Sequence, residues 1–334
     1  MTATATTPVS VEHESAPPPK SRRPKLPKFA LAIPSWVWYL GFFIIPVLVV
    51  VWYSFGYKPP VTAGQGPIGT DRLSLDNYRE AFSDTFFKTF QNTLRVAITG
   101  TLLCLFIGFP AAYFIAVKMP AKWRGLMLAL VIIPFWTSFL IRTIAWRIVL
   151  APEGWLSHFM QTVGLRDTPI RFLDTREAVQ LGVVYNYLPL MIFPLFVALD
   201  RLDPALREAS KDLGASRVKT FIQVTVPLAA PGMVAGLLLV FIPLAGDYIT
   251  ASVLGGAKGN MAGALVATQF LAAQNWALGS AMAVVLIFTI LASIVVAAII
   301  ALVVRAVVRK IRAIDVAPPA VAAPVGAALS GAQP

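Results

Sequence analysis

The hydrophobic positions of this chain gather in long, nearly unbroken runs rather than in the narrow stripes of soluble helices. Six runs are long enough to cross about 30 Å of hydrocarbon, which takes about 20 helical residues. A helix also satisfies its own backbone polar groups inside lipid. We therefore predict an all-α, polytopic membrane protein with six transmembrane helices. The predicted spans are residues 31–57, 92–117, 125–150, 178–199, 229–252 and 281–304.

Prolines interrupt five of the six runs. Inside a membrane helix they are tolerated where neighbouring helices satisfy the freed carbonyl groups, so we expect kinks that face the bundle. These prolines are Pro34, Pro46, Pro110, Pro134, Pro189, Pro194 and Pro243.

The polar segments divide the chain further. Residues 1–30 and 313–334 are rich in Pro, Ala and small polar residues, and we predict that both tails are disordered. Residues 31–312 form the predicted transmembrane domain. The two longest connections, residues 58–91 and 151–177, each contain a segment that we expect to form a short surface helix.

Composition and charge support this interpretation. The chain is 57% hydrophobic and only 13% charged, about half the charge of a soluble protein. Its net charge of +12 lies beside the ends of spans and lacks the aromatic and basic pattern of nucleic-acid binding. The excess of Lys and Arg marks the cytoplasmic side, which predicts a multi-pass cell-membrane protein with both termini inside. The basic groups on that side are Lys20, Arg22, Arg23, Lys25 and Lys28; Lys118, Lys122 and Arg124; Arg201, Arg207, Lys211, Arg217 and Lys219; and Arg305, Arg309, Lys310 and Arg312.

The connection between the fourth and fifth predicted spans is too polar to cross the membrane. Asp203-Pro204 is a helix start, with a side-chain cap followed by proline in the first turn. Gly214 can end that helix in the left-handed conformation, and Ser216 can cap a second short helix. Pro227 leads into the fifth span. An apolar stripe is predicted on the first helix from Leu202, Leu206, Ala209 and Leu213.

This connection resembles the EAA loop of ABC importer permeases. That pattern is EAA, three residues, Gly, nine residues and then Ile-x-Leu-Pro. Here it is matched by Glu208, Ala209, Ser210, Gly214 and the segment 224–227, "VTVP", with mild departures. The resemblance implies a coupling helix that docks on a separate ATPase subunit. The ATPase-coupling residues that it implies are Glu208, Ala209, Ser210, Gly214 and Pro227.

Three further stretches look like the spermidine/putrescine permease family: "PFWTSFLIRTIAW", "VVYNYLPLMIFPLF" and "FIPLAGDYITASVLGGAK". The resemblance covers roughly residues 31–304. It implies a type I ABC importer permease fold, transport of a polyamine, and no catalysis in this chain. The implied partners are ABC ATPase subunits, a second permease that is a copy or a paralogue, and an external solute-binding protein. The chain has no P-loop for ATP, and we expect no cofactor and no metal site.

Asp247 is the single acidic residue within a predicted span. Because an ionisable group at membrane depth is costly, it is a candidate for a functional site. One interpretation is a contact with a polyamine ammonium on the substrate pathway. The other is a packing role, with the carboxylate bonded to a neighbour such as Arg142 or Tyr185.

Aromatic residues near these stretches could pack on a cationic aliphatic chain through cation–π contacts. Ordinary bundle packing or an interfacial aromatic belt is the alternative for each. The candidates, beside Asp247, are Trp136, Tyr185, Tyr187 and Tyr248. Two basic residues late in the third span, Arg142 and Arg147, are predicted to extend toward the outer headgroups.

Two other classes of protein remain as alternatives. A self-contained secondary transporter would usually carry internal repeats, and the last three spans show no convincing repeat of the first three. An intramembrane enzyme would need a catalytic pair, and no such pair is evident. An ABC permease for another small solute is the nearest alternative, because related permeases share this fold.

Overall fold

The computed structural model describes residues 32–60, 67–165, 167–169, 171–256 and 259–314. Over these residues the regular structure is helical, and one isolated bridge joins Tyr57 to Gly69. The predicted all-α class is therefore confirmed. The two tails predicted to be disordered lie outside the described residues, except that Ala313 and Ile314 belong to the last helix.

The first of two compact units comprises residues 1–49. Its helices are α1 (Ile33–Tyr39), the π-helical turn η2 (Leu40–Ile44) and the first part of α2 (Ile45–Tyr53). Together they make a continuous apolar run, Ile33–Tyr53, that is long enough to cross a membrane. The wide turn η2 ends two residues before Pro46, whose missing N–H prevents a regular hydrogen bond at that position.

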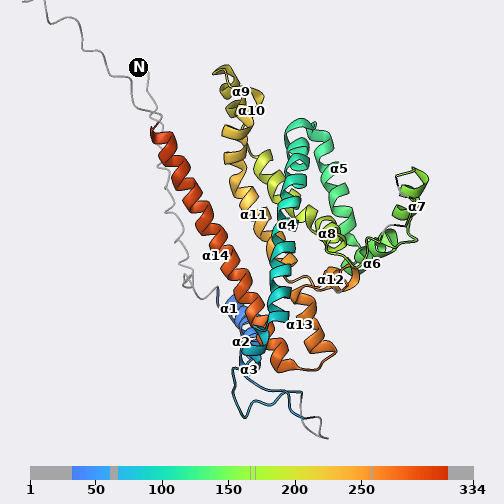
Figure 1. The fold of residues 1–334 in the computed structure, drawn as a ribbon. Helices are drawn as coiled ribbons and strands as arrows, with labels where there is room; N and C mark the ends of the chain where they lie inside the picture. The colour runs from blue at the N-terminus through green and yellow to red at the C-terminus, as the bar shows by residue number, and fades with distance from the viewer. Residues whose placement is uncertain (1–31, 61–66, 166, 170, 257–258, 315–334) are drawn as a thin grey trace, which may run out of the picture. The chain divides into compact units, whose positions relative to one another are not determined.

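The second unit, residues 50–334, holds the other helices. Figure 1 shows them in chain order. They are α3 (Asp76–Ala81), α4 (Asp84–Tyr113), η3 (Phe114–Lys118), α5 (Ala121–Ile132), η4 (Ile133–Trp136), α6 (Phe139–Leu150), α7 (Trp155–Thr162), α8 (Arg176–Asp200), α9 (Pro204–Asp212), α10 (Arg217–Thr220), η5 (Phe221–Thr225), α11 (Val226–Ala245), α12 (Ile249–Leu254), α13 (Ala262–Leu271) and α14 (Trp276–Ile314). The short helices α3 and α7 lie in the two connections where surface helices were predicted.

The third predicted span is broken. Its two halves, Ala121–Trp136 and Phe139–Thr162, meet at an angle of 89°. The 3-10 turn η4 begins at Ile133-Pro134, and the Thr137 hydroxyl donates to the Pro134 carbonyl at 2.7 Å. Among the described residues the spans therefore number five, or six when the bent pair is counted as one.

The fifth predicted span ends earlier than expected. We predicted a helix through Ser252, but α11 ends at Ala245 and Gly246–Tyr248 is not helical. The prediction that Asp247 lies within a spanning helix is thus wrong. The hydropathy stays high across this point because α12 is also apolar, so composition alone does not show the break. A further helix, α13, is too short to span and was not predicted.

The core of the second unit forms where α4, α8 and α11 pack together. Two glycines of α11 allow close contact with α8. A Cβ atom on Gly232 would lie 2.6 Å from the Pro194 carbonyl oxygen, and one on Gly236 would lie 2.7 Å from the Met191 sulfur. Small residues at such positions let membrane helices approach closely. A smaller second cluster joins α3, α13 and α14.

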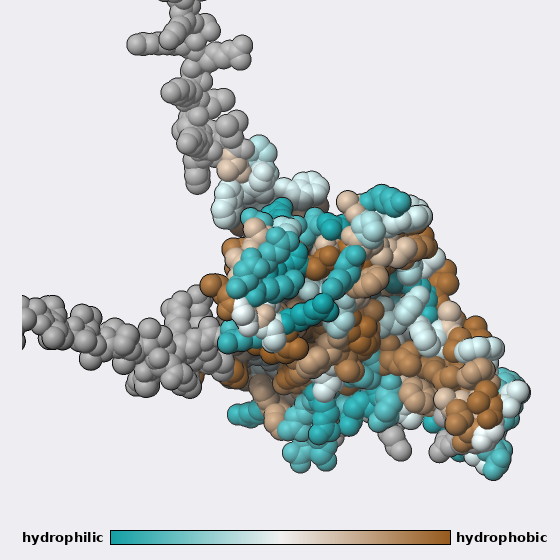
Figure 2. All heavy atoms as spheres, turned by 90° about the horizontal axis from the view of Figure 1, so that it is seen from above, coloured by the Kyte–Doolittle hydropathy of each residue, from teal (hydrophilic) through white to brown (hydrophobic). Residues whose placement is uncertain are grey.

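The polar connections of the second unit gather at opposite ends. The turn between α4 and α5 lies with α9 and α10 at one end (Figure 1). There Arg124 forms an ion pair with Asp200 at 2.5 Å. Seen from that end, hydrophilic side chains collect on the face and hydrophobic ones show around its flanks (Figure 2). Elsewhere, Asn92 of α4 links the start of α8 to the segment before α13. Its side-chain oxygen accepts a hydrogen bond from Arg176, and its side-chain nitrogen donates one to the Asn260 carbonyl.

Candidate functional site

The helix–turn–helix of α9 and α10 has the local chemistry that its sequence predicts. The Asp203 carboxylate accepts from the Ala205 backbone N–H at 2.9 Å, and Pro204 occupies the first helical position. The Ser216 hydroxyl accepts from the Lys219 N–H at 3.3 Å and so caps α10. Both predicted caps are confirmed, because each depends on residues within one turn of the cap.

Gly214 ends α9 with a φ of +83°, in the left-handed region. The Gly214 N–H donates to the Lys211 carbonyl at 2.8 Å, and the Ala215 N–H donates to the Ser210 carbonyl at 3.1 Å. These two bonds define a Schellman motif, which satisfies the last carbonyl groups of a helix. Space around Gly214 is open, because an added Cβ would meet nothing within 4 Å. Conformation rather than crowding therefore requires glycine here.

The two short helices are joined by a side-chain contact. The Ser210 and Thr220 hydroxyl groups lie 3.1 Å apart in a hydrogen bond, and Thr220 is buried. Glu208 and Ala209, the two residues before Ser210 in α9, are exposed. Serine at the third position of the EAA pattern therefore stabilises the helix pair, while its two neighbours remain accessible.

The apolar stripe predicted on α9 is only partly buried. Leu202 packs against the core, whereas Leu206 is half-exposed and Leu213 is 89% exposed. Val218, on α10, and Ile222, in the following turn η5, are also exposed. We refer to the exposed apolar side chains of this region together as the α9–α10 apolar surface: Leu206, Leu213, Val218 and Ile222.

Pro227 lies in the first turn of α11. The preceding turn η5 is π-helical, and this wider turn accommodates the missing proline N–H. Helical structure consequently continues without a break from Arg217 to Ala245. The fifth span thus extends directly from the helix–turn–helix, with no loop between them.

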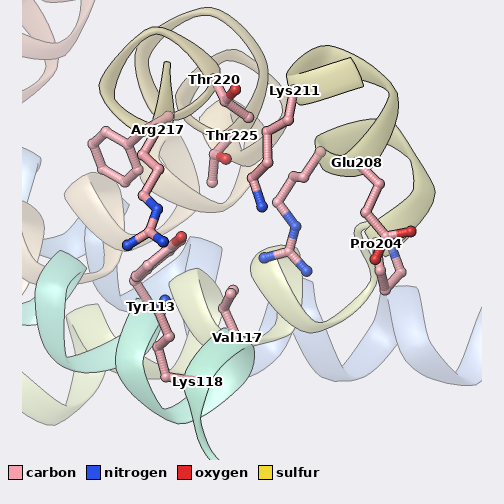
Figure 3. A pocket seen from close by; sticks show the side chains of 11 residues that line it. Tyr113, Val117, Lys118, Pro204, Glu208, Lys211, Arg217, Thr220 and Thr225 are labelled. Carbon is pink, nitrogen blue, oxygen red and sulfur yellow. The ribbon is translucent and has the colours of Figure 1, made fainter. Parts of the chain in front are cut away.

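A cleft of about 390 Å³ separates α9 and α10 from the end of α4. Figure 3 shows Lys211 and Arg217 pointing into it, whereas the Glu208 carboxylate lies beside Pro204 at its edge. Lys118, at the end of η3, also lines the cleft. Lys118 is far in the sequence from Lys211 and Arg217, and the charge pattern assigns all three to one side of the membrane. The structure brings them together in this cleft.

Asp247, the candidate for the substrate pathway, lies in the break between α11 and α12 and is 6% exposed. Its Oδ1 accepts from the Thr250 backbone N–H at 2.9 Å, and its Oδ2 accepts from the Thr250 hydroxyl at 2.5 Å. The carboxylate therefore caps the start of α12. The bonded neighbour is Thr250, and not Arg142 or Tyr185 as the packing interpretation suggested.

The four aromatic candidates occupy different environments. Tyr187 is buried near Asp247, and its hydroxyl donates to the Pro243 carbonyl at 3.4 Å. Tyr185 packs edge-on against Trp146, with ring centroids 5.3 Å apart. Tyr185 and Tyr187 are two positions apart and so point to different sides of α8. Tyr248 is half-exposed, and Trp136, at the 89° bend, is 85% exposed.

Two arginines of α6 form contacts that the sequence did not indicate. Arg142 does not extend to the outer headgroups: it is 9% exposed, and its guanidinium carbon lies 4.8 Å from the Phe135 ring centroid and 5.6 Å from that of Phe139. Arg147 is exposed but donates to the Val253 carbonyl at 2.5 Å, at the end of α12. The contacts of both arginines depend on the bend before α6, and the bend brings α6 beside α12. Apolar composition does not reveal this bend.

Polar groups inside apolar helices were the missed signal for this region. Asn186 and Thr143 are buried and share a hydrogen bond of 3.2 Å. Their occurrence in two predicted spans could have marked a polar contact between α6 and α8. Among the described residues no three His, Cys, Asp or Glu side chains lie together in a way that could hold a metal ion.

Comparisons with known proteins agree with this architecture. Residues 105–313 match the protein family described as "Binding-protein-dependent transport system inner membrane component". The chain is 39% identical over 249 residues to the spermidine/putrescine transport system permease protein PotB of Escherichia coli (strain K12), covering 75% of this chain and 88% of that protein. It is 37% identical over 260 residues to PotB of Haemophilus influenzae, covering 78% and 88%.

A solved structure has a similar fold. It is a chain of a bacterial ABC transporter involved in the import of the acidic polysaccharide alginate, with a TM-score of 0.62 and 18% sequence identity. The likeness covers 79% of this chain and 92% of that chain. At this identity it supports the fold, and it says nothing of the solute.

Proposed function

The chain belongs to the family of binding-protein-dependent transport system inner membrane components, and on that premise we propose that it is the permease subunit of an ATP-driven polyamine importer. The observation that carries the proposal is the identity with PotB, 39% over three quarters of the chain. The proposed solutes are spermidine and putrescine, the compounds named for those relatives. Transport, rather than catalysis, is the role of this chain.

The α9–α10 apolar surface is the proposed contact with a separate ATPase subunit. Leu213 and Val218 are exposed in the polar connection between the fourth and fifth predicted spans, which we assign to the cytoplasm. Exposed apolar groups of this kind mark interaction sites. Glu208, on the same helix α9, is exposed and offers a charge to a basic partner. The Schellman turn at Gly214 holds the two helices in a defined geometry.

Continuity from Arg217 to Ala245 supports a mechanical role for this contact. A displacement of α10 by the ATPase is carried along one helix to the break at Asp247. No flexible loop intervenes to absorb it. ATP hydrolysis in the partner can in this way change the conformation of the membrane domain.

The basic end of the second unit is assigned to the cytoplasm, with both termini on that side. The support is the clustering of Lys118, Arg207, Lys211 and Arg217 around one cleft, as expected for the positive side of a membrane protein. An ATPase is a cytoplasmic partner, so the same assignment places the α9–α10 apolar surface where it can dock. A second permease, similar to this one, and an external binding protein complete the proposed assembly.

For the substrate pathway we propose a division of roles among the five candidates. Trp136, Tyr185 and Tyr248 have exposed ring surface that can contact an alkylammonium chain by cation–π interaction. Tyr187 and Asp247 are buried and act when the α11–α12 break opens. An ionised carboxylate can accept about four hydrogen bonds. Asp247 can therefore contact an ammonium group while it still accepts two bonds from Thr250.

The decisive experiment is transport by the complete complex in proteoliposomes, with labelled spermidine or putrescine. Uptake is expected to require ATP inside the vesicle and the binding protein outside it, and to persist when an ionophore collapses the proton gradient. A Walker-lysine variant of the ATPase is the matched control. Uptake driven by an ion gradient through this chain alone would instead establish a secondary transporter. ATP-dependent uptake of another solute, with no competition by polyamines, would support the assignment as an ABC importer but overturn the assignment of polyamines as the solute.

A further inference from the structure

The cleft between α9, α10 and the end of α4 has a strongly unbalanced charge. Four basic side chains line it, from three separate segments of the chain, against the single carboxylate of Glu208. They are Lys118, Arg207, Lys211 and Arg217. The ion pairs within the described part of the chain are Arg79–Asp76 and Arg124–Asp200, so none of the four is paired there.

Figure 3 shows how these groups are arranged. Lys211, from α9, and Arg217, at the start of α10, direct their nitrogens toward the interior of the cleft. Glu208 lies at the rim beside Pro204 and does not separate them. Like charges brought this close repel one another, and a bound anion relieves that repulsion. Arginine also offers a fork of N–H donors that suits phosphate oxygens.

Apolar and aromatic side chains of membrane-spanning helices also line the cleft, beside the hydroxyl groups of Thr220 and Thr225. Phe221 packs edge-on against Tyr113, with ring centroids 5.4 Å apart, and against Phe109 at 5.6 Å. Val117 lies beside them. The apolar span of α4 and η3 ends at Lys118, so the cleft opens at the level where this helix leaves the hydrocarbon. An occupant thus meets apolar side chains and hydroxyl groups as well as cations.

The size of the cleft excludes a single small ion as its full occupant. Its volume of about 390 Å³ is many times the roughly 10–15 Å³ that a cavity needs to hold one water molecule. A phosphodiester with its attached glycerol fits such a space better than a chloride ion does. Basic pockets between membrane helices on the cytoplasmic side are known to hold anionic lipid headgroups.

We propose that this cleft binds the phosphate headgroup of an anionic phospholipid of the cytoplasmic leaflet. The occupant places its phosphate among Lys118, Arg207, Lys211 and Arg217 and its acyl chains along the apolar side of α4. The proposal rests on the cytoplasmic assignment of this end and is independent of the transported solute. Its consequence is a lipid that links α4 to the helix pair α9–α10.

The test compares lipid binding by two charge-matched variants of the full-length chain in its purified complex. The first is Lys118→Gln with Arg217→Gln, which removes two cations from the cleft. The second is Lys122→Gln with Lys219→Gln, which removes two neighbouring cations that do not line it. The probe is spin-labelled phosphatidylglycerol in phosphatidylcholine vesicles, with spin-labelled phosphatidylcholine as reference.

Removal of each cation from the cleft is expected to lower the relative affinity for phosphatidylglycerol about fivefold. The first variant should therefore lose about 25-fold, and the second less than twofold, with both complexes intact by gel filtration. An equal loss of phosphatidylglycerol affinity in both variants would overturn the proposal, because diffuse surface charge rather than the cleft would then attract the lipid. If inorganic phosphate displaced the spin-labelled phosphatidylglycerol as well as unlabelled phosphatidylglycerol does, in detergent, the ligand would be a soluble phosphate rather than a lipid, which would overturn the proposal. Loss of the ATPase subunit from the first variant alone would show that an acidic protein surface occupies the cleft.

Discussion

Replacing Gly214 with valine should uncouple the permease from its ATPase while leaving the protein in the membrane. The glycine adopts a φ of +83° and forms a Schellman motif through two backbone hydrogen bonds, of 2.8 and 3.1 Å. An L-residue in the left-handed conformation costs about 1–2 kcal/mol, and a β-branched side chain lies at the upper end of that range. The structure adds no steric cost, because nothing lies within 4 Å of the added Cβ.

This open space makes the magnitude a matter of backbone conformation alone. A penalty of about 1 kcal/mol for alanine lowers the population of the turn, relative to its opened form, about fivefold. A penalty of about 2 kcal/mol for valine lowers it about 30-fold. Asparagine tolerates the left-handed region, so Gly214→Asn serves as the matched control. The expected order of coupled activity is Gly, then Asn, then Ala, then Val.

The assay is stimulation of ATP hydrolysis by the solute-loaded binding protein, in complexes reconstituted at equal abundance. Basal ATPase activity and subunit composition are the controls. Both should stay unchanged, because the turn lies outside the membrane core. Wild-type stimulation of the valine variant would refute the reasoning. An asparagine variant as defective as valine would also refute it, because a close approach by the partner backbone, rather than the turn conformation, would then explain the glycine.

Three further predictions follow from the structure. Glu208→Lys should abolish uptake and ATPase stimulation without lowering membrane abundance, because Glu208 is exposed on α9; normal uptake at normal abundance would remove its coupling role. Asp247→Asn should lower the initial rate of spermidine uptake per assembled complex. The amide oxygen still accepts from Thr250, but the negative charge is lost. An unchanged rate would exclude an essential role for the charge, and a loss of protein abundance would indicate a packing role. Gly232→Leu should reduce the folded protein recovered from membranes, since its Cβ would lie 2.6 Å from the Pro194 carbonyl oxygen and overpacking costs about 1–3 kcal/mol; full recovery with unchanged thermal stability would contradict this packing.

Local chemistry explains what the sequence predicts well. The caps at Asp203 and Ser216 and the turn at Gly214 each depend on hydrogen bonds within a few residues. Long apolar runs predict spans because the membrane requires about 20 residues, whatever the helix packs against. These features could be recognised before any tertiary contact was known.

Tertiary contacts explain what the sequence does not predict. The break at Asp247 lies between two apolar helices, so hydropathy continues across it although the backbone does not. Gly263, at the start of α13, packs against the Gly246 carbonyl at this point, a contact that local hydropathy does not predict. Arg142 is buried and contacts the Phe135 and Phe139 rings, and the chain bends sharply between Trp136 and Phe139. Prolines signal that a helix can bend, but its neighbours determine the direction and the angle.

The position of Gly232 along the helix from Arg217 to Ala245 has a mechanical consequence. Its closest backbone contact with α8 lies near the middle of that helix and divides it into two arms of about 20 Å each at 1.5 Å per residue. A tilt of about 5° around this fulcrum would move each end by roughly 2 Å, in opposite directions. A push on α10 would therefore reach Asp247 with its size unchanged and its direction reversed.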